Sequence, residues 1–354
     1  MPPVNPSEIL QSFSLPPAEY KVHEIKQGLI NDTFLVRQGS QIRYVLQRIN
    51  TAVFGDAQAL MGNIQKALPM LRASDYQQIL LIKTRRGHHY LDAEAQGCWR
   101  LMTFIPGSIT YNTTNNPQTA FEAGRVLGRF HGLLREADPA DFTTVIPGFH
   151  SLPLRYTQYK KALESGRPER RAMAAHAINM VNSLMGDPPS LPTEKMTSRL
   201  CHNDTKLNNI LFSAADGKAL CLIDLDTLME GCFPYDFGDA VRTIVNTAPE
   251  DERILSRITF SRPLFNQFIK GLAEEEGLLT REEIQYLPQG AVYMPLLHGI
   301  RALTDYLNDD KYYQTTYEGQ NLDRSISLFA FAQKARAELD FIGEQTAKHL
   351  LPPG

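Results

Sequence analysis

The chain has 354 residues, of which 43% are apolar and 21% are charged, and its formal net charge is −3. This length and composition predict a globular protein of two lobes, and the charge provides no basic field for nucleic acid. No stretch approaches the roughly 20 apolar residues of a membrane-spanning helix, and the N-terminus has no signal-peptide pattern, so we expect a cytoplasmic protein without a membrane or nucleic-acid partner.

The first part of the chain alternates apolar and polar side chains, which is typical of a small antiparallel sheet. Strands are predicted over residues 20–26, 33–37, 44–48, 79–83 and 98–104, with a hairpin at Gln38-Gly39-Ser40 and a helix over 57–73. The pattern stops at Pro106-Gly107. We therefore divide the chain into an N-terminal lobe, residues 1–104, and a C-terminal lobe, residues 105–354.

The C-terminal lobe is predicted to be mainly helical. From residue 118 onward the apolar residues recur at the helical period, and the stripe that continues to residue 137 predicts a core helix. Further helices are predicted over 264–276, from a capping box at Thr280 and Glu283, through 296–307, and over 322–350. The fold class is therefore α+β, with a small antiparallel β-rich lobe and a larger helical one.

The segment from His202 to Asn209 carries the chemistry. Its spacing, His-x-Asp-x-x-x-x-Asn, matches the catalytic loop of kinases position by position. Asp204 is the candidate base for an acceptor hydroxyl, whereas Asn209 and Asp224 offer oxygen ligands to Mg²⁺. Such residues also form ordinary loops. Here, however, apolar runs flank the segment and predict strands on both sides of it, which favours the catalytic interpretation.

Neighbouring polar residues allow more than one interpretation. His202 is predicted to brace the loop through a backbone hydrogen bond, and Lys206 either approaches the γ-phosphate or is a solvated loop lysine. If the strand continues past Asp224, Asp226 faces the same side and binds the metal's outer shell or a hydroxyl; otherwise it is a turn residue. Two further aspartates are predicted to be helix N-caps, namely Asp236 and Asp239.

Several segments together carry a family resemblance. They are Gly28 to Val36, Tyr44 to Asn50, His202 to Leu211, Ile223 to Thr227, Tyr235 to Arg242 and Gly299 to Leu307. On these segments the chain resembles the aminoglycoside phosphotransferase and choline kinase superfamily, and within it the bacterial N-acetylhexosamine 1-kinases. The resemblance implies a bilobal protein-kinase-like fold. It also implies phosphorylation of the anomeric hydroxyl of N-acetylglucosamine or N-acetylgalactosamine, with ATP as co-substrate and Mg²⁺ as cofactor.

The resemblance assigns the nucleotide site to the N-terminal lobe. The turn with Gly28, Asn31 and Thr33 lies where kinases cover the phosphates, although a single glycine is also typical of an ordinary hairpin. On the third strand many kinases place a lysine against the phosphates, and here that position is Gln47, followed by Arg48 on the opposite face. Either the Gln47 amide contacts the phosphates, or another residue supplies the positive charge there. Lys206 completes the predicted ATP-binding set.

The resemblance places Arg301 and Tyr312 at the sugar. Arg301 lies in an otherwise apolar helix, which burial alone does not favour, but it could equally pair with Asp305 or reach solvent. Leu29 departs from related hexosamine kinases, which can carry a histidine there. The alternatives are a kinase for choline, homoserine, methylthioribose or an aminoglycoside, and a non-catalytic nucleotide-binding regulator. The single tryptophan, Trp99, provides no aromatic cage for choline.

Overall fold

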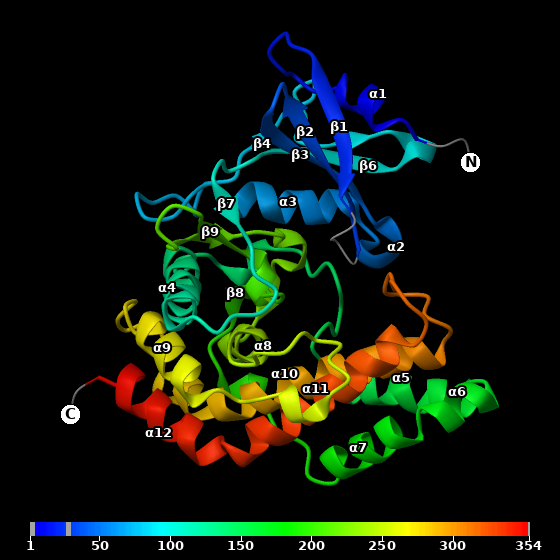
Figure 1. The fold of residues 1–354 in the computed structure, drawn as a ribbon. Helices are drawn as coiled ribbons and strands as arrows, with labels where there is room; N and C mark the ends of the chain where they lie inside the picture. The colour runs from blue at the N-terminus through cyan, green and yellow to red at the C-terminus, as the bar shows by residue number, and fades with distance from the viewer. Residues whose placement is uncertain (1–3, 26–29, 353–354) are drawn as a thin grey trace.

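Alternating side chains in the N-terminal part form an antiparallel sheet, which the computed structural model shows at the top of the molecule (Figure 1). The structure describes residues 4–25 and 30–352. The sheet has six strands in the order β1-β2-β3-β6-β4, with β5 also paired to β6. Their bounds are β1 Tyr20–Ile25, β2 Asp32–Gln38, β3 Gln41–Ile49, β4 Leu81–Ile82, β5 Leu91–Asp92 and β6 Cys98–Thr103. The predicted β2–β3 hairpin is confirmed.

Two faces of this sheet are covered differently. On one face Val36, Leu46 and Trp99 pack in a small core with α1 (Pro6–Leu10). On the other side α2 (Thr51–Phe54) and α3 (Ala57–Ala67) belong to the main core of the protein. Helix α3 is shorter than the predicted 57–73, because Pro69 has no N–H for a further helical hydrogen bond.

Short hairpins carry the polar motif at the top of the C-terminal part. One sheet has the order β10-β9-β7, and a separate ladder pairs β11 with β8. The strands are β7 Ser108–Ile109, β8 Arg199–Cys201, β9 Ile210–Ser213, β10 Ala219–Leu222 and β11 Met229–Gly231. Because β7 pairs with β9, the chain has already entered the C-terminal sheet at residues 108–109.

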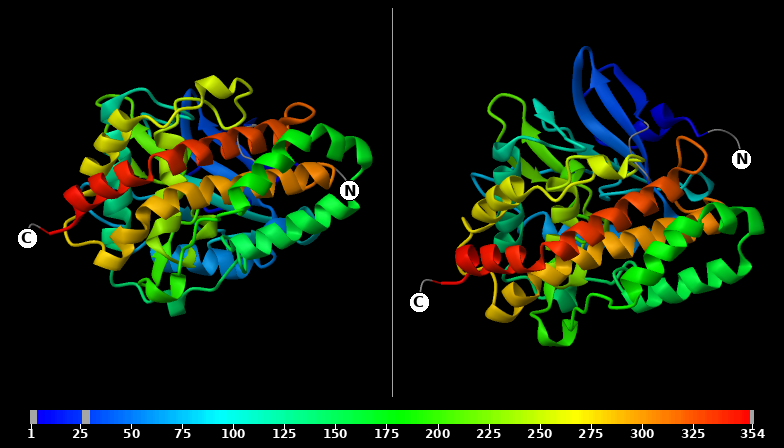
Figure 2. Two further views of the ribbon diagram at one scale, coloured as in Figure 1. Left: turned by 90° about the horizontal axis from the view of Figure 1, so that it is seen from below. Right: turned by 60° about the horizontal axis from the view of Figure 1, so that its bottom comes forward.

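Nine helices make up the remainder of the described C-terminal part. They are α4 Pro117–Leu133, α5 Leu152–Ser165, α6 Pro168–Met173, α7 Ala175–Met185, α8 Phe233–Ile244, α9 Arg262–Leu272, α10 Arg281–Leu307, α11 Gln320–Ala337 and α12 Leu339–Leu350. Helices α10 and α11 lie side by side beneath the hairpins, and α8 contacts α10 (Figures 1 and 2). Every described helix is too short or too polar to cross a bilayer.

Two predicted helix boundaries are wrong. The capping box at Thr280 is present, but the helix it opens continues without a break to Leu307, through Pro288 and Pro295. Most residues of α10 are buried, and this packing outweighs the helix-breaking preference of proline. The single helix predicted over 322–350 is instead divided between α11 and α12, because Glu338 adopts φ −105° and ψ 10° and caps one helix where the next begins.

Candidate active site

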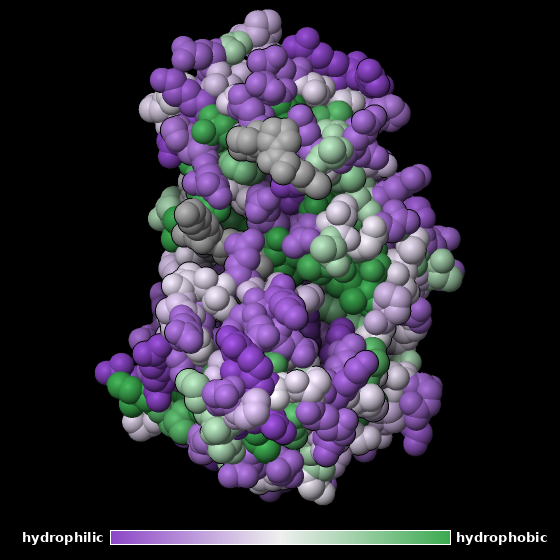
Figure 3. All heavy atoms as spheres, turned by 90° about the vertical axis from the view of Figure 1, so that its right-hand side faces the viewer, coloured by the Kyte–Doolittle hydropathy of each residue, from purple (hydrophilic) through white to green (hydrophobic). Residues whose placement is uncertain are grey.

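A cleft opens between the two lobes, and the predicted catalytic residues lie along it. Figure 3 shows the surface hollowed between its upper and lower parts, with hydrophobic side chains gathered along one wall. The charged residues that line this cleft are Asp204, Lys206, Asp224, Asp226, Arg242, Glu250, Arg301 and Arg324. Uncharged lining residues include Asn31, Thr33, Gln47, Phe54, Phe149, His298 and Tyr313. The structure therefore brings the predicted base Asp204, the predicted metal ligand Asp224 and the predicted acceptor residue Arg301 to one cleft.

Asp204 lies in the loop after β8 and is held as an anion. Its Oδ2 accepts a bond from Lys206 Nζ at 2.8 Å and another from Asn209 Nδ2 at 2.9 Å. Burial raises the pKa of Asp204, but the adjacent Lys206 ammonium outweighs burial, so the net pKa lies below its usual value. Lys206 thus contacts the base rather than water. Among the described residues none hydrogen-bonds Oδ1, which leaves that oxygen for an acceptor hydroxyl.

Asp236 in α8 anchors this loop from below, so its predicted role as a helix cap is wrong. Its two oxygens accept the backbone N–H groups of His202 and Asn203 at 2.8 and 2.7 Å. His131 in α4 adds a third contact, at 2.9 Å to Oδ2. The reason is geometric: the first turn of α8 lies directly against the loop, whose unpaired N–H groups need an acceptor. Asp239 instead pairs with Arg242 at 2.7 Å.

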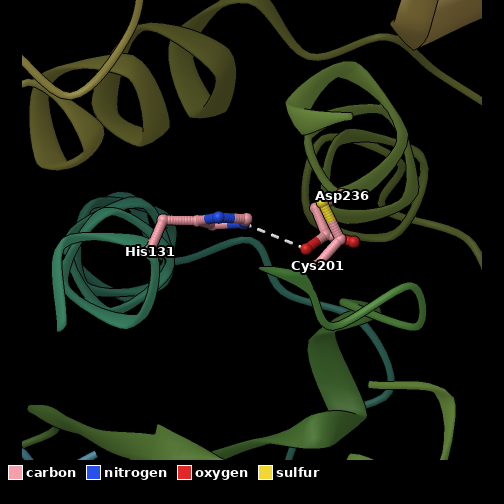
Figure 4. A group of neighbouring side chains, drawn as sticks. All are labelled: His131, Cys201 and Asp236. Atoms are coloured by element: carbon pink, nitrogen blue, oxygen red, sulfur yellow. Dashed lines mark hydrogen bonds and ion pairs between the residues drawn. The ribbon is translucent and has the colours of Figure 1, made fainter. Parts of the chain in front are cut away.

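Figure 4 shows His131, Asp236 and Cys201 together, a combination that resembles a metal site by composition. Their ligand atoms lie within 4.8 Å of one another and all three residues are buried. Both Asp236 oxygens are already hydrogen-bonded, and burial raises the pKa of the Cys201 thiol well above its usual value. A neutral thiol is a poor metal ligand. The cluster is therefore a structural support for the catalytic loop.

His202 braces the loop as predicted. Its Nε2 lies 2.9 Å from the carbonyl oxygen of Ile223, and its Nδ1 accepts the N–H of Asp204 at 3.2 Å. These two contacts fix the tautomer, because Nδ1 must be unprotonated to accept and Nε2 must then carry the proton that it donates. The imidazole links the base to the strand that leads into Asp224.

Asp224 follows β10 in the left-handed conformation, with φ 65°. Burial and the neighbouring Asp226 carboxylate raise its pKa to about 6. Asn209 donates its amide hydrogens to Asp204, so its carbonyl oxygen is left as a ligand. An anionic oxygen and a neutral oxygen suit Mg²⁺, which prefers hard ligands, and a cation would relieve the electrostatic cost of the buried Asp224. The donor set thus fits the predicted magnesium site.

Asp226 does not lie on a continuing strand, as one interpretation required. The strand ends at Leu222, and residues Leu225–Thr227 form a 3-10 turn. The Asp226 carboxylate, 3% exposed, forms an ion pair with Arg100 of β6 and accepts a bond of 2.6 Å from Asn31. With both oxygens engaged, the predicted contact with an acceptor hydroxyl is disfavoured. Arg100 carries no motif, and we did not predict its role.

Three of the predicted nucleotide residues, Asn31, Thr33 and Gln47, line the cleft from the N-terminal lobe. Gln47 donates to the Thr33 hydroxyl at 3.1 Å and accepts from Arg100 at 2.7 Å. Arg48 points to the other face of β3, where it lies 3.9 Å from Asp32 at the surface. The predicted contribution of Gly28, like the departure at Leu29, lies outside the described residues.

Arg301 also lines the cleft, and it is not paired with Asp305, one of the two alternatives for it. Asp305 instead accepts the N–H groups of Tyr312 and Tyr313 at 2.8 and 3.0 Å and so holds that loop against the cleft. The Arg301 guanidinium lies 4.7 Å from the ring centre of Phe149 and donates to the Tyr312 hydroxyl at 3.2 Å. Tyr312 is 37% exposed, and its neighbour Tyr313 is the tyrosine that lines the cleft.

Buried charges that no motif indicated surround Arg301. Glu250 forms ion pairs with Arg242 and, at 3.7 Å, with Arg324. Burial lowers the pKa of His298, and the nearby Arg242 and Arg301 guanidiniums lower it further, so this imidazole is neutral. Arg324 lies in α11 beside buried polar residues such as Asn321 and Ser327, so no apolar stripe of the kind that singled out Arg301 marks it in the sequence.

The model of the phosphotransferase enzyme family (APH) matches residues 21–262, which is more than half of the chain. The chain belongs to this family. The match spans the catalytic loop, Asp224 and the strands of the N-terminal sheet, so the activity class of the cleft is phosphotransfer.

Solved structures share this fold. A microcompartment-associated aminopropanol kinase is 17% identical with a TM-score of 0.63 and matches 96% of this chain and 98% of its own. An aminoglycoside phosphotransferase from Alicyclobacillus acidocaldarius is 15% identical with a TM-score of 0.58, over 98% of each chain. A choline kinase from Cryptosporidium parvum is 14% identical with a TM-score of 0.53, over 91% of this chain and 90% of its own. At these identities the likeness establishes the bilobal kinase-like fold of this phosphotransferase.

Proposed function

We propose that this phosphotransferase transfers the γ-phosphate of ATP to the anomeric hydroxyl of an N-acetylhexosamine, N-acetylglucosamine or N-acetylgalactosamine, and releases the sugar 1-phosphate. The family supports phosphotransfer, and the resemblance of the sequence to N-acetylhexosamine 1-kinases supports the acceptor. The remaining question is whether the charges of the cleft suit a neutral sugar.

The residues of the catalytic loop have different roles in the proposed phosphotransfer. Asp204 orients the acceptor hydroxyl and receives its proton on Oδ1 as the oxygen attacks phosphorus. Lys206 keeps the base ionised and neutralises charge beside it. Asn209 and Asp224 would hold Mg²⁺, which when bound supplies positive charge at the β- and γ-phosphates. The ordered loop contributes chiefly by fixing the distance between base and phosphate.

The positive charge of Arg301 favours one class of acceptor over another. Arg301 has no carboxylate within ion-pair distance among the described residues, and its contacts are the Tyr312 hydroxyl and the rings of Phe149, Tyr312 and Tyr313. An acceptor here therefore meets an uncompensated cation. A neutral sugar benefits, because the guanidinium offers several donors to hydroxyl or amide oxygens, and aromatic rings suit the apolar face of a sugar.

The same observation disfavours a cationic acceptor. The solved structures that share the fold include kinases named for aminopropanol, choline and ethanolamine, and the acceptors of these names carry a positive charge at neutral pH. Such an ammonium requires acidic or aromatic groups, but Glu250, a carboxylate that lines the cleft, is shared between Arg242 and Arg324. An ammonium beside Arg301 would experience like-charge repulsion instead.

A coupled assay of ADP release across a panel of acceptors tests the proposal. The panel contains the two N-acetylhexosamines, simple hexoses, choline, homoserine, methylthioribose and aminoglycosides, and the Asp204→Asn variant gives the background rate. We expect turnover with an N-acetylhexosamine. Turnover with choline or an aminoglycoside alone would refute the proposal and establish the amine alternative. The methyl glycoside of the active sugar must be inert, because its methyl group occupies the attacking oxygen, and a reactive glycoside would show that another hydroxyl is phosphorylated.

A further inference from the structure

In the N-terminal lobe, the cleft is lined by an uncharged residue, Gln47, at the position where many kinases have a lysine. The positive charge lies instead on Arg100, which contacts Gln47 but does not line the cleft. Strands β3 and β6 pair with Gln47 opposite Arg100. The Arg100 side chain is 1% exposed, and its Nε and Nη2 donate to Gln47 Oε1 at 3.0 and 2.7 Å. Arg100 therefore supports the cleft without facing it.

This arrangement dictates how the Gln47 amide is oriented. A guanidinium has only donors, so the oxygen of the amide must face Arg100 and the NH₂ group must face away. That NH₂ donates one hydrogen to the Thr33 hydroxyl at 3.1 Å. Because Thr33 accepts this bond, its own hydroxyl hydrogen is free to donate, and the second amide hydrogen of Gln47 is free as well. Both side chains line the cleft, so two neutral donors are presented there.

The remaining arm of Arg100 reaches the other lobe. Its Nη1 pairs with Asp226, which lies two residues after Asp224 and accepts a second bond, of 2.6 Å, from Asn31. Asn31 in turn accepts the N–H of Asn50 at 3.0 Å. A buried ion pair is stable only when the donors and acceptors outside the pair are also hydrogen-bonded. Gln47 bonds the remaining donors of Arg100, and Asn31 bonds the second oxygen of Asp226. One guanidinium thus joins the sheet to the turn that carries Asp224.

We propose that Arg100 is a positioning residue for the nucleotide. Through Gln47 it aims two neutral donors at the phosphates, and through Asp226 it sets their distance from Asp224. This inference rests on the proposed use of ATP but not on the identity of the acceptor. It also accounts for the missing lysine, since an ammonium at position 47 would lie against the Arg100 guanidinium and be repelled.

The test measures binding of Mg·ADP by calorimetry, together with melting temperatures. Arg100→Met should weaken Mg·ADP binding on the order of tenfold or more, the effect of losing hydrogen bonds aimed by a charged group. Arg100→Lys should recover part of this loss, because an ammonium can hold Gln47 or Asp226 but not both. Arg48→Met on the opposite face of β3 is the control and should bind like wild type.

Variants of Gln47 keep the test decisive if Arg100→Met does not fold. Gln47→Leu should weaken Mg·ADP binding on the order of tenfold, and the double variant with Arg100→Met should lose less than the two single losses combined, because Arg100 acts through Gln47. Gln47→Lys should weaken binding too. Tighter binding by Gln47→Lys, or wild-type affinity in Arg100→Met, would overturn the inference. Failure of the wild-type protein to bind Mg·ADP would instead refute the proposed use of ATP.

Discussion

Substitution of Asp236 by asparagine isolates the support of the catalytic loop, because the side chain keeps its shape and loses only its charge and one acceptor. Asp236 is fully buried and accepts the N–H groups of His202 and Asn203 on separate oxygens. An amide has one oxygen, so in either orientation its NH₂ group faces one of these two N–H groups. His131 can adapt by changing its tautomer, but a backbone N–H cannot.

The expected cost has two parts. The buried backbone N–H that loses its acceptor costs about 1–3 kcal/mol. The bonds that persist lose their ionic character, and since charge-assisted bonds are about twice as strong as neutral ones, this adds about 1–2 kcal/mol. We therefore expect Asp236→Asn to lower the free energy of unfolding by about 2–5 kcal/mol. Activity should fall as well, because Asn203 is adjacent to the base.

Urea unfolding followed by far-UV circular dichroism measures this loss, with Asp75→Asn as the matched control. Asp75 pairs with Arg129 at 3.2 Å, but its side chain is 52% exposed, and removing such a surface pair costs less than about 1 kcal/mol. If Asp236→Asn were as stable as the control, the two N–H contacts would not be what holds the loop.

Three further outcomes are expected. Asp204→Asn should lower kcat about 100-fold or more while the Kd for Mg·ADP stays near that of wild type, as steady-state kinetics and calorimetry would show. Asp224→Ala should remove the Mg²⁺ dependence of ADP binding, so that titrations with Mg²⁺ and with EDTA coincide. Gly124→Ala should destabilise the protein, because the added Cβ would lie 1.9 Å from the carbonyl oxygen of Phe268 where α4 crosses α9. Gly62→Ala is the contrasting variant: no atom lies within 4 Å of the added Cβ, so the change should stabilise α3 by about 0.5–1 kcal/mol. Thermal melts of both variants measure these effects.

Patterns local in sequence predicted most of the strands and the order of the catalytic hairpins. The alternation of apolar and polar residues predicted β2 and β3. The turn at Gly39 predicted their register, because a hairpin pairs two strands that are consecutive along the chain. Predictions failed where burial outweighed propensity. A helix opened at Thr280 and another through 296–307 were predicted, but they form the single helix α10, which continues through Pro288 and Pro295 because most of its residues are buried.

The part of the site that escaped prediction is long-range pairing of charges. Arg100 and Asp226 are 126 residues apart, and His131 and Asp236 are 105 apart. No spacing rule connects such residues, and each alone resembles an ordinary polar residue of a strand, turn or helix. Asp226 was predicted to bind a hydroxyl or the metal's outer shell only if the strand continued past Asp224, and it does not. Only the path of β6 above the turn shows that a guanidinium takes up its charge.

The charges that line the cleft can be matched to their ion-pair partners. Among the described residues, Asp204 pairs with Lys206, and Glu250 with Arg242. Two charges that line the cleft, the anion Asp224 and the cation Arg301, have no ion-pair partner among these residues. A buried charge without a partner is costly, so each is retained where a ligand supplies the opposite charge or hydrogen-bond acceptors. The anion suits a divalent cation carried with the nucleotide. The cation would suit the oxygens of the neutral acceptor that we propose.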